Sequence, residues 1–364
     1  MNESSMKEIK KDMELNKKRN FSEELLEFIS PYHVSINPYE LESASADLTS
    51  LPSYHYKFKK KYLASYIVRP ANTEELQKVI RKCKELDIPI TIRSAGTSCF
   101  SSATPSRGGA IIDVRRLNKI YEVDAEKKTV KVGSGISWLN LIEALVDYGL
   151  QPECYPTSFK TSCVGGFIGT PGTAGIGILK YGSMENSIIS LDLVKPDGSL
   201  EKITQDSTGD HSGYTITLSD VCGTYGIYGV VANVELSVTT LKTSLEIIGY
   251  GFNSINDATA FYSTLKKEMP NKPFFLSISE SNFEKYSHVD YPKNEWLVWA
   301  VFYDDPEHTS KSISTVKSLA SKMEGTEVES SYLKEKWRDI SDAEVGIGVS
   351  TRNLIFQEYW IADK

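Results

Sequence analysis

The amino-acid sequence predicts an α+β protein built in two parts. From Ser65 onward, short apolar strands alternate with amphipathic helices and with loops rich in glycine. After Leu241 the glycine density falls, and the order of elements becomes that of a split βαβ, or ferredoxin-like, layer. A chain of 364 residues has room for about two domains. We therefore expect a polar helical extension over residues 1–60, one domain over 61–241 and a second over 242–364.

Composition and charge exclude several classes of protein. Lysine and arginine total 41 and aspartate and glutamate 48, and the net charge of −7 argues against a dedicated nucleic-acid binder. No stretch reaches the ~20 apolar residues that span a bilayer, and the first residues show no secretory signal. The five cysteines are scattered, and no cysteine–histidine cluster has metal-ligand spacing. We expect a cytoplasmic protein without a metal, with peripheral attachment to the inner face of the membrane as a second option.

Local patterns place the expected elements. Asn72 is the expected cap of a helix with a glutamate three residues on, and the apolar stripe of this helix consists of Leu76, Val79, Ile80 and Cys83. Strands of the first part are expected at 66–68, 88–92, 110–114, 129–132, 188–194 and 227–238. Strands of the second part are expected at 245–250, 274–279, 296–303 and 354–360, and helices at 255–267, 309–323 and 333–340. The strand at 88–92 is expected to be buried.

Three loops rich in small residues each adjoin an expected strand. Loop 1, Arg93–Ser98, has backbone N–H groups that are free to converge on an anion such as a diphosphate. Loop 2, Pro156–Gly166, continues to Gly182 with hydroxyls and glycines that let a flat ring or a phosphate approach closely. In loop 3, Cys222–Ile227, a backbone edge can pair with a purine. One such loop is explained by the tolerance of glycine for positive φ in turns, but three in order favour one extended ligand.

Other nucleotide and catalytic motifs are missing from the sequence. Gly172–Gly177 reads G-x-x-G-x-G, the reverse of the dinucleotide fingerprint, and no matching βαβ unit surrounds it. The sequence has no Gly-Lys pair and therefore no P-loop, and it has neither H-E-x-x-H nor G-x-S-x-G. These absences argue against a Rossmann dinucleotide site, a zinc protease and an α/β-hydrolase.

Taken together, the loop sequences resemble the FAD-binding motifs of the vanillyl-alcohol-oxidase flavoproteins. Within that family the chain is most similar to the branch of the glycolate oxidase subunit and D-lactate dehydrogenase. Supporting matches are Ser45-Ala46-Asp47, Val68-Arg69-Pro70 and Val194-Lys195-Pro196-Asp197-Gly198. The likeness is strong over 65–241 and weak over 242–364.

The resemblance implies a two-lobed PCMH-type FAD-binding domain followed by a partial ferredoxin-like α+β cap domain. It assigns the pyrophosphate of FAD to Arg93, Ser94, Ala95, Gly96, Thr97 and Ser98. It assigns the flavin side of the cradle to Pro156, Thr157, Ser158, Ser162, Cys163, Gly165, Gly166, Thr170, Gly172, Thr173, Ala174, Tyr181 and Gly182, and the adenine side to Gly226, Ile227 and Val230. Several members attach FAD covalently to a histidine of loop 1, which has none here, so we expect non-covalent FAD.

The sequence also departs from the family pattern. Cys163 stands where threonine is usual, and the chain reaches Lys364 without the family's H-x-G-D-G-N segment. The expectation is therefore a fragment, a degenerate paralogue or half of a split enzyme, with a second subunit or a homo-oligomer covering the open cap.

The activity implied by the resemblance is oxidation of a 2-hydroxy acid such as D-lactate or glycolate, with hydride transfer to the flavin N5. Arg338 and Arg352 are weak candidates for a carboxylate clamp, with surface ion pairing favoured for both. A quinone or an iron–sulphur subunit is the implied electron acceptor. Two alternatives stay open: a non-catalytic or split FAD-binding subunit that needs a partner chain, and an ether-lipid synthase-like flavoenzyme.

Overall fold

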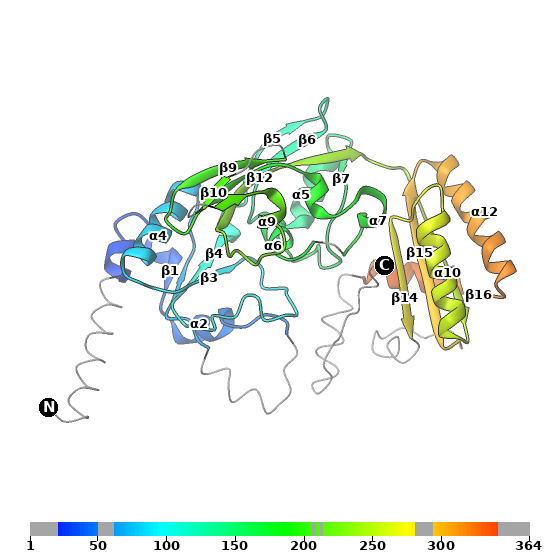
Figure 1. Ribbon diagram of the computed structural model, residues 1–364, viewed down its shortest axis with the longest axis horizontal. Helices are drawn as coiled ribbons and strands as arrows, with labels where there is room; N and C mark the ends of the chain where they lie inside the picture. Colours follow the sequence, from blue (N-terminus) through cyan, green and yellow to red (C-terminus); the bar gives the residue numbers. More distant parts are fainter. Residues whose placement is uncertain are drawn as a thin grey trace, which may run out of the picture.

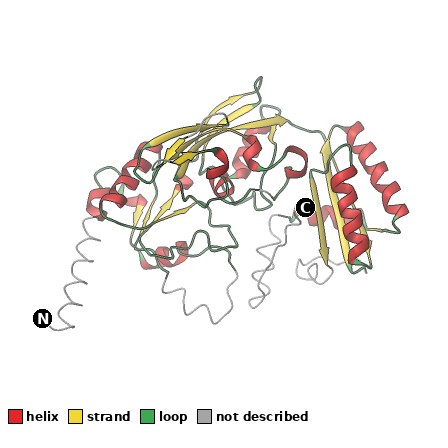
Figure 2. Ribbon diagram, viewed as in Figure 1, coloured by secondary structure: helices red, strands yellow, loops and turns green. Residues whose placement is uncertain are grey.

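The computed structural model describes residues 21–49, 62–172, 174–205, 209–211, 214–280 and 294–340. Figure 1 shows two bodies, joined where the long strand β12 (Val230–Thr240) leads into β13 (Ser244–Phe252). Figure 2 shows that helices and sheets occur together in both bodies. Within the described ranges, no helix is long and apolar enough to cross a membrane. We propose residue 241, just after β12, as the domain boundary.

The first lobe is built on a four-stranded sheet with the order β1-β2-β4-β3. Its strands are β1 (Val34–Ser35), β2 (Tyr66–Val68), β4 (Ala110–Asp113) and β3 (Ile90–Arg93). The strands β2, β4 and β3 run parallel, whereas β1 pairs antiparallel with β2. The short helical segments of this lobe are η1 (Pro31–His33), α2 (Pro38–Ala44) and η3 (Val114–Arg116).

Helix α4 (Thr73–Glu85) of the first lobe confirms the predicted cap and apolar stripe. The Asn72 Oδ1 atom accepts the Glu75 N–H at 2.9 Å, which satisfies a donor of the first turn. The four stripe residues are all buried in the lobe's core: Leu76, Val79, Ile80 and Cys83. Burial raises the pKa of the Cys83 thiol to about 12, so this cysteine is a packing residue.

Two features of the first lobe differ from the expectations. Strand β3 is not buried: among the described strands it pairs with β4 alone, at the edge of the sheet, and Ile90 is 36% exposed. Part of the expected solvated extension belongs to the core, because Phe21, Leu25 and Ile29 are at most 2% exposed and pack in the same cluster as α4. These three residues form too short a stripe among charged neighbours to be distinguished from a surface helix by pattern alone.

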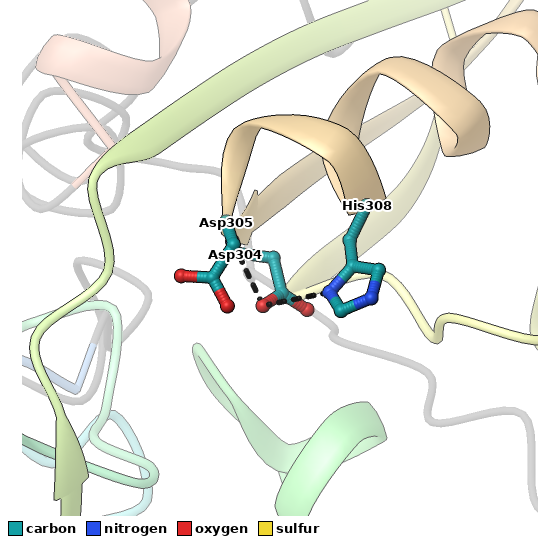
Figure 3. Close-up of side chains that lie close together, drawn as sticks. All are labelled: Asp304, Asp305 and His308. Atoms are coloured by element: carbon teal, nitrogen blue, oxygen red, sulfur yellow. Dashed lines mark hydrogen bonds and ion pairs between the residues drawn. The ribbon is translucent and has the colours of Figure 1, made fainter.

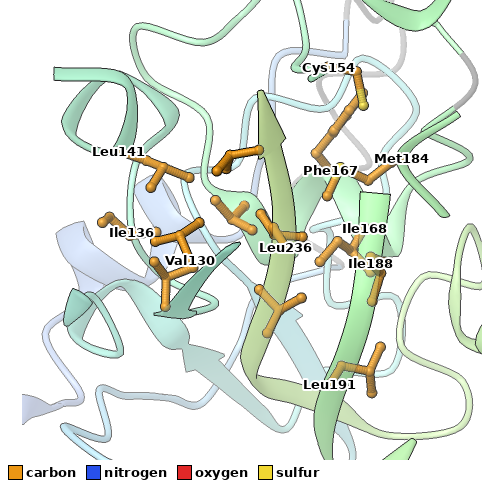
Figure 4. Packing of buried hydrophobic residues seen from close by; sticks show 14 of the residues in the cluster. Val130, Ile136, Leu141, Cys154, Phe167, Ile168, Met184, Ile188, Leu191 and Leu236 are labelled. Atoms are coloured by element: carbon orange, nitrogen blue, oxygen red, sulfur yellow. The ribbon is translucent and has the colours of Figure 1, made fainter. Parts of the chain in front are cut away.

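The second lobe is built on a larger, antiparallel sheet with the order β5-β6-β12-β8-β9, and β7 also pairs with β12. The new strands are β5 (Ile120–Asp124), β6 (Thr129–Gly133), β7 (Leu150–Pro152), β8 (Ile188–Val194) and β9 (Leu200–Thr204), with the separate ribbon β10 (Gly209–His211) and β11 (Tyr214–Ile216). The helices are α5 (Trp138–Val146), α6 (Val164–Gly169), α7 (Ile178–Tyr181), α8 (Met184–Ser187) and α9 (Leu218–Val221). Figure 4 shows their side chains packed together, with Leu141, Phe167 and Ile168 among them.

The second body is a ferredoxin-like α+β layer. Its strands are β13, β14 (Phe275–Glu280), β15 (Trp296–Asp304) and β16 (Thr326–Glu327), in the antiparallel order β14-β15-β13-β16. Helices α10 (Ile255–Glu268) and α12 (Pro306–Lys322) cover one face, and α13 (Ser330–Arg338) covers the other. The order of elements confirms the predicted split βαβ arrangement. The strand expected at 354–360 lies outside the described residues.

Candidate cofactor-binding site

Loop 1 presents a row of backbone donors. All of its residues are half-buried, and Gly96 has a φ of +71°, a conformation that glycine adopts without strain. No hydrogen bond within the described part of the chain uses the N–H groups of Gly96, Thr97 or Ser98. Consecutive N–H groups in such a turn form a concavity that binds anions. Loop 1 therefore fits a phosphate or a diphosphate.

Loop 1 lies against the start of helix α6. The Ala95 N–H donates to the thiol of Cys163, the residue that precedes α6. The Ser94 Oγ occupies the place that a Cβ atom would take at Gly166, so the absence of a side chain lets the two segments touch. Burial raises the pKa of Cys163 to about 11, and the hydrogen bond from Ala95 opposes this only in part. Cys163 is therefore a neutral thiol at neutral pH.

Loop 3 is attached to the other end of the same helix. The N–H groups of Gly223 and Tyr225 donate to the carbonyls of Ile168 and Gly169, at 2.9 and 2.8 Å. These carbonyls belong to the last turn of α6, where backbone acceptors have no partner within the helix. Helix α6 thus brings loops 1 and 3 together, although they are far apart in the sequence.

The residues assigned to the adenine side differ in what they offer. Gly226, with a φ of +82°, lies close to β3, where an added Cβ would be 3.5 Å from Ile92 Cγ1. Ile227 is 72% exposed, so its apolar side chain is accessible to a ligand ring. The Val230 side chain is 4% exposed and packs with Val194 in the first lobe's core.

Loop 2 is held by its own hydrogen bonds. Pro156 is buried, and Thr157 and Ser158 are half-buried. Ser162 donates its N–H to the Ser158 carbonyl at 2.9 Å and accepts the Trp138 N–H at 3.0 Å. The Ser162 hydroxyl is sealed from solvent without a partner among the described residues. The backbone of Ser162 therefore holds loop 2 against the start of α5.

The candidates just after α6 pack against α8. Thr170 Oγ1 donates to the Phe167 carbonyl at 3.0 Å, and the buried Gly172 accepts the Met184 N–H at 3.1 Å. Ala174 is half-buried, and Thr173 lies outside the described residues.

Tyr181 and Gly182 do not join the loops at α6. Tyr181 ends helix α7, and its hydroxyl forms a hydrogen bond with Thr239 of β12. Its ring lies edge-on to Phe274, just before β14, with centroids 6.5 Å apart. These two candidates are therefore placed at the junction of the two bodies.

A fourth turn, Gly133-Ser134-Gly135, begins at the last residue of β6 and leads toward α5, and it was not among the predicted loops. A Cβ atom at Gly135 would overlap the Val114 carbonyl oxygen. The Ser134 carbonyl accepts the Gly165 N–H at 2.7 Å, which fixes the first turn of α6 from a second side. Two glycines at the end of a strand were the signal in the sequence that could have revealed this turn. Neither glycine has a positive φ, so their role is to let another backbone segment approach closely.

An ionic cluster joins the two bodies beside Tyr181. Asp304, at the end of β15, binds Lys180 of α7 at 2.5 Å and Lys242 of the linker at 2.9 Å. Figure 3 shows Asp305 and His308 next to it, with His308 Nδ1 3.6 Å from the Asp304 carboxylate. Because two lysines already neutralise Asp304, we interpret this cluster as a structural junction.

The proposed carboxylate clamp gains no support from Arg338. Its side chain is 69% exposed and binds Asp339 at 2.9 Å and Glu335 at 3.4 Å, both from its own helical segment. This arrangement matches the surface ion pairing that the sequence analysis favoured. Arg352 lies outside the described residues.

Comparisons with known proteins define the class. Residues 64–204 match the family model described as FAD binding domain. The glycolate oxidase subunit GlcD of Bacillus subtilis is 26% identical over 303 residues, which is 80% of this chain and 63% of that protein. A D-lactate dehydrogenase of Archaeoglobus fulgidus is 28% identical over 192 residues, which is 53% of this chain and 42% of that protein. The chain thus spans less than two thirds of the length of these relatives.

A solved structure of alkyldihydroxyacetonephosphate synthase aligns with a TM-score of 0.74 over 92% of this chain and 64% of that chain, at 18% identity. At that identity the likeness concerns the fold alone. The two lobes and the following α+β layer have the fold of a PCMH-type FAD-binding protein. Residues 64–204 thus carry an FAD binding domain, and the relatives support the vanillyl-alcohol-oxidase family, in the glycolate oxidase and D-lactate dehydrogenase branch.

Proposed function

We propose that the chain binds FAD non-covalently and uses it to oxidise a 2-hydroxy acid of the D-lactate or glycolate type. The supporting observation is the row of open N–H groups at Gly96–Ser98, which lies against α6 in a chain with an FAD-binding domain. In this proposal loop 1 holds the diphosphate, loop 2 and α6 adjoin the flavin, and Gly226 and Ile227 adjoin the adenine. When bound, FAD supplies the hydride acceptor.

Non-covalent attachment is the first testable part. Loop 1 contains no histidine, and the Cys163 thiol next to it is protonated at neutral pH because burial raises its pKa to about 11. We expect acid precipitation of the yellow protein to leave the flavin in the supernatant. A yellow pellet that survives washing would contradict this prediction, and the variant Cys163→Ser would then show whether the thiol is the point of attachment.

Oxidation of a hydroxy acid is tested by the absorption of the bound flavin. We expect anaerobic D-lactate or glycolate to bleach the flavin band near neutral pH, with L-lactate as the control for chirality. If dithionite bleaches the band but none of the hydroxy acids does, the oxidation proposal is wrong while FAD binding stands.

A non-catalytic FAD-binding subunit is the second candidate. It is favoured by the ion pairs of Arg338 with two carboxylates of its own segment. Arg338 is the one described residue of the expected substrate clamp, and these ion pairs occupy its guanidinium. The relative from Bacillus subtilis is named a subunit, so we propose a partner chain that supplies a quinone or an iron–sulphur electron acceptor. Bleaching that needs the partner chain would favour this candidate. An addition reaction of the ether-lipid synthase type stays a third option.

A further inference from the structure

Residues 45–49, here named the strap, are tied to both ends of loop 1. At the start of the loop, Arg93 Nη1 donates to the Ala46 carbonyl at 2.7 Å. At its end, the Ser98 carbonyl accepts the Leu48 N–H at 3.0 Å. These two hydrogen bonds anchor Arg93 and Ser98 to the strap. The open N–H groups belong to Gly96, Thr97 and Ser98, so they lie between the two anchored residues or on the second one. The strap therefore spans the part of the loop that presents donors.

The strap also holds the chain that follows loop 1. Thr49 Oγ1 accepts the Ser101 N–H at 2.5 Å, and Asp47 Oδ2 accepts the Ala103 N–H at 3.4 Å. The other oxygen of Asp47 accepts the Thr49 N–H at 3.1 Å, which fixes the shape of the strap itself. Asp47 thus links the strap's own turn to the segment beyond loop 1.

Arg93 adds a positive charge behind the row of donors. Its guanidinium fills the space where a Cβ atom would stand at Gly96, so it lies directly against the turn. Arginine stays protonated in proteins, and a cation behind converging N–H groups strengthens the attraction for a polyanion. The hydrogen bond from Arg93 to the Ala46 carbonyl therefore has two effects: it orients this charge and it holds loop 1 against the strap.

We propose that the strap presets loop 1 for a diphosphate, and that Asp47 and Arg93 are positioning residues for the diphosphate of FAD. This inference rests on the proposed binding of FAD. A loop with converging, unpaired N–H groups is not favourable by itself, because its donors repel one another and its backbone loses freedom. Hydrogen bonds that hold it in this form before the ligand arrives raise the affinity for the ligand, since less order is lost on binding.

The test compares ligands with and without a diphosphate. The full-length apoprotein is titrated with FAD, ADP and riboflavin, and binding is followed by flavin fluorescence or, for ADP, by displacement of FAD. For Asp47→Ala and Thr49→Val we expect the Kd for FAD and for ADP to rise about tenfold, with riboflavin unaffected. The matched control is Asp197→Ala, because Asp197 likewise accepts a backbone N–H, from Ser199 at 2.8 Å, in the distant β8–β9 turn.

Variants of Arg93 separate the effect of its charge on FAD affinity from a purely structural effect on the fold. Arg93→Met removes both the charge and the hydrogen bond to Ala46, whereas Arg93→Lys keeps the charge. We therefore expect Arg93→Lys to bind FAD more tightly than Arg93→Met. The two apoproteins should have equal melting temperatures. Equal losses for FAD and riboflavin, or FAD affinity unchanged in all strap variants, would overturn the strap inference. A wild-type protein that binds none of the three ligands would instead refute the proposed function itself.

Discussion

Gly166→Ala is expected to weaken FAD binding by one to two orders of magnitude without lowering the stability of the apoprotein much. An added Cβ atom would overlap the Ser94 Oγ and push loop 1 away from α6. Overpacking of this kind typically costs about 1–3 kcal/mol. If loop 1 relieves the overlap in the apoprotein by moving away from α6, the cost falls on FAD binding, where it corresponds to roughly five- to 150-fold in Kd. Alanine is also the better helix former, so any loss must come from the contact with loop 1. Fluorescence titration of the apoprotein with FAD measures the effect.

Helix α6 offers its own control for this prediction. Gly169 lies in the same helix with nothing within 4 Å of an added Cβ atom, so Gly169→Ala should bind FAD like the wild type. In the double variant Ser94→Ala with Gly166→Ala, the nearest atom becomes Ser94 Cβ at 3.7 Å, an ordinary contact, and most of the affinity should return. Equal affinities for Gly166→Ala and Gly169→Ala would show that loop 1 does not depend on this approach.

Among the variants proposed here, Asp304→Ala is expected to cause the largest loss in the free energy of unfolding. It leaves Lys180 and Lys242 with side chains only 14% and 19% exposed and without their shared carboxylate. Removal of one member of a largely buried ion pair typically costs about 3–5 kcal/mol in the free energy of unfolding. Urea denaturation followed by tryptophan fluorescence measures the change. Asp305→Ala is the matched control, because Asp305 is 56% exposed and should contribute less than ~1 kcal/mol.

The same carboxylate predicts a pH dependence. Burial alone would raise the pKa of Asp304, but hydrogen bonds from Lys180 and Lys242 outweigh it and lower the pKa below the ordinary 3.8. A carboxylate with a lowered folded pKa stabilises the fold above its unfolded pKa and loses that contribution as the pH falls. The difference in unfolding free energy between wild type and Asp304→Ala should therefore be constant at neutral pH and shrink below about pH 4. A difference that stays unchanged down to pH 3 would refute the role of this ion pair.

Local patterns in the sequence predicted most elements correctly. The cap at Asn72, the stripe of α4 and the order of elements after Leu241 depend on residues within a few positions of one another. Burial within the sheets depends on which strands are neighbours, so the sequence missed that β3 lies at an edge. It also missed that Phe21 and Leu25 belong to the core, since their partners are distant in the chain.

For the candidate site, the sequence by itself determined the chemistry. It placed small residues in three loops beside strands, and these loops carry the likeness to FAD-binding flavoproteins. Only the tertiary structure decided which candidates meet. It gathered loops 1 and 3 on α6, buried the Ser162 hydroxyl and the Val230 side chain, and placed Tyr181 at the junction of the two bodies.

The contacts that hold the site in place also came from the tertiary structure. The strap and loop 1 are joined by Arg93 and Ala46, and the two bodies by Lys180 and Asp304, and each pair is separated by many residues. A short motif specifies the backbone freedom and the polar groups of its own segment. Which backbone groups stay open for a ligand depends on long-range packing, because that packing decides which of them are already paired within the protein.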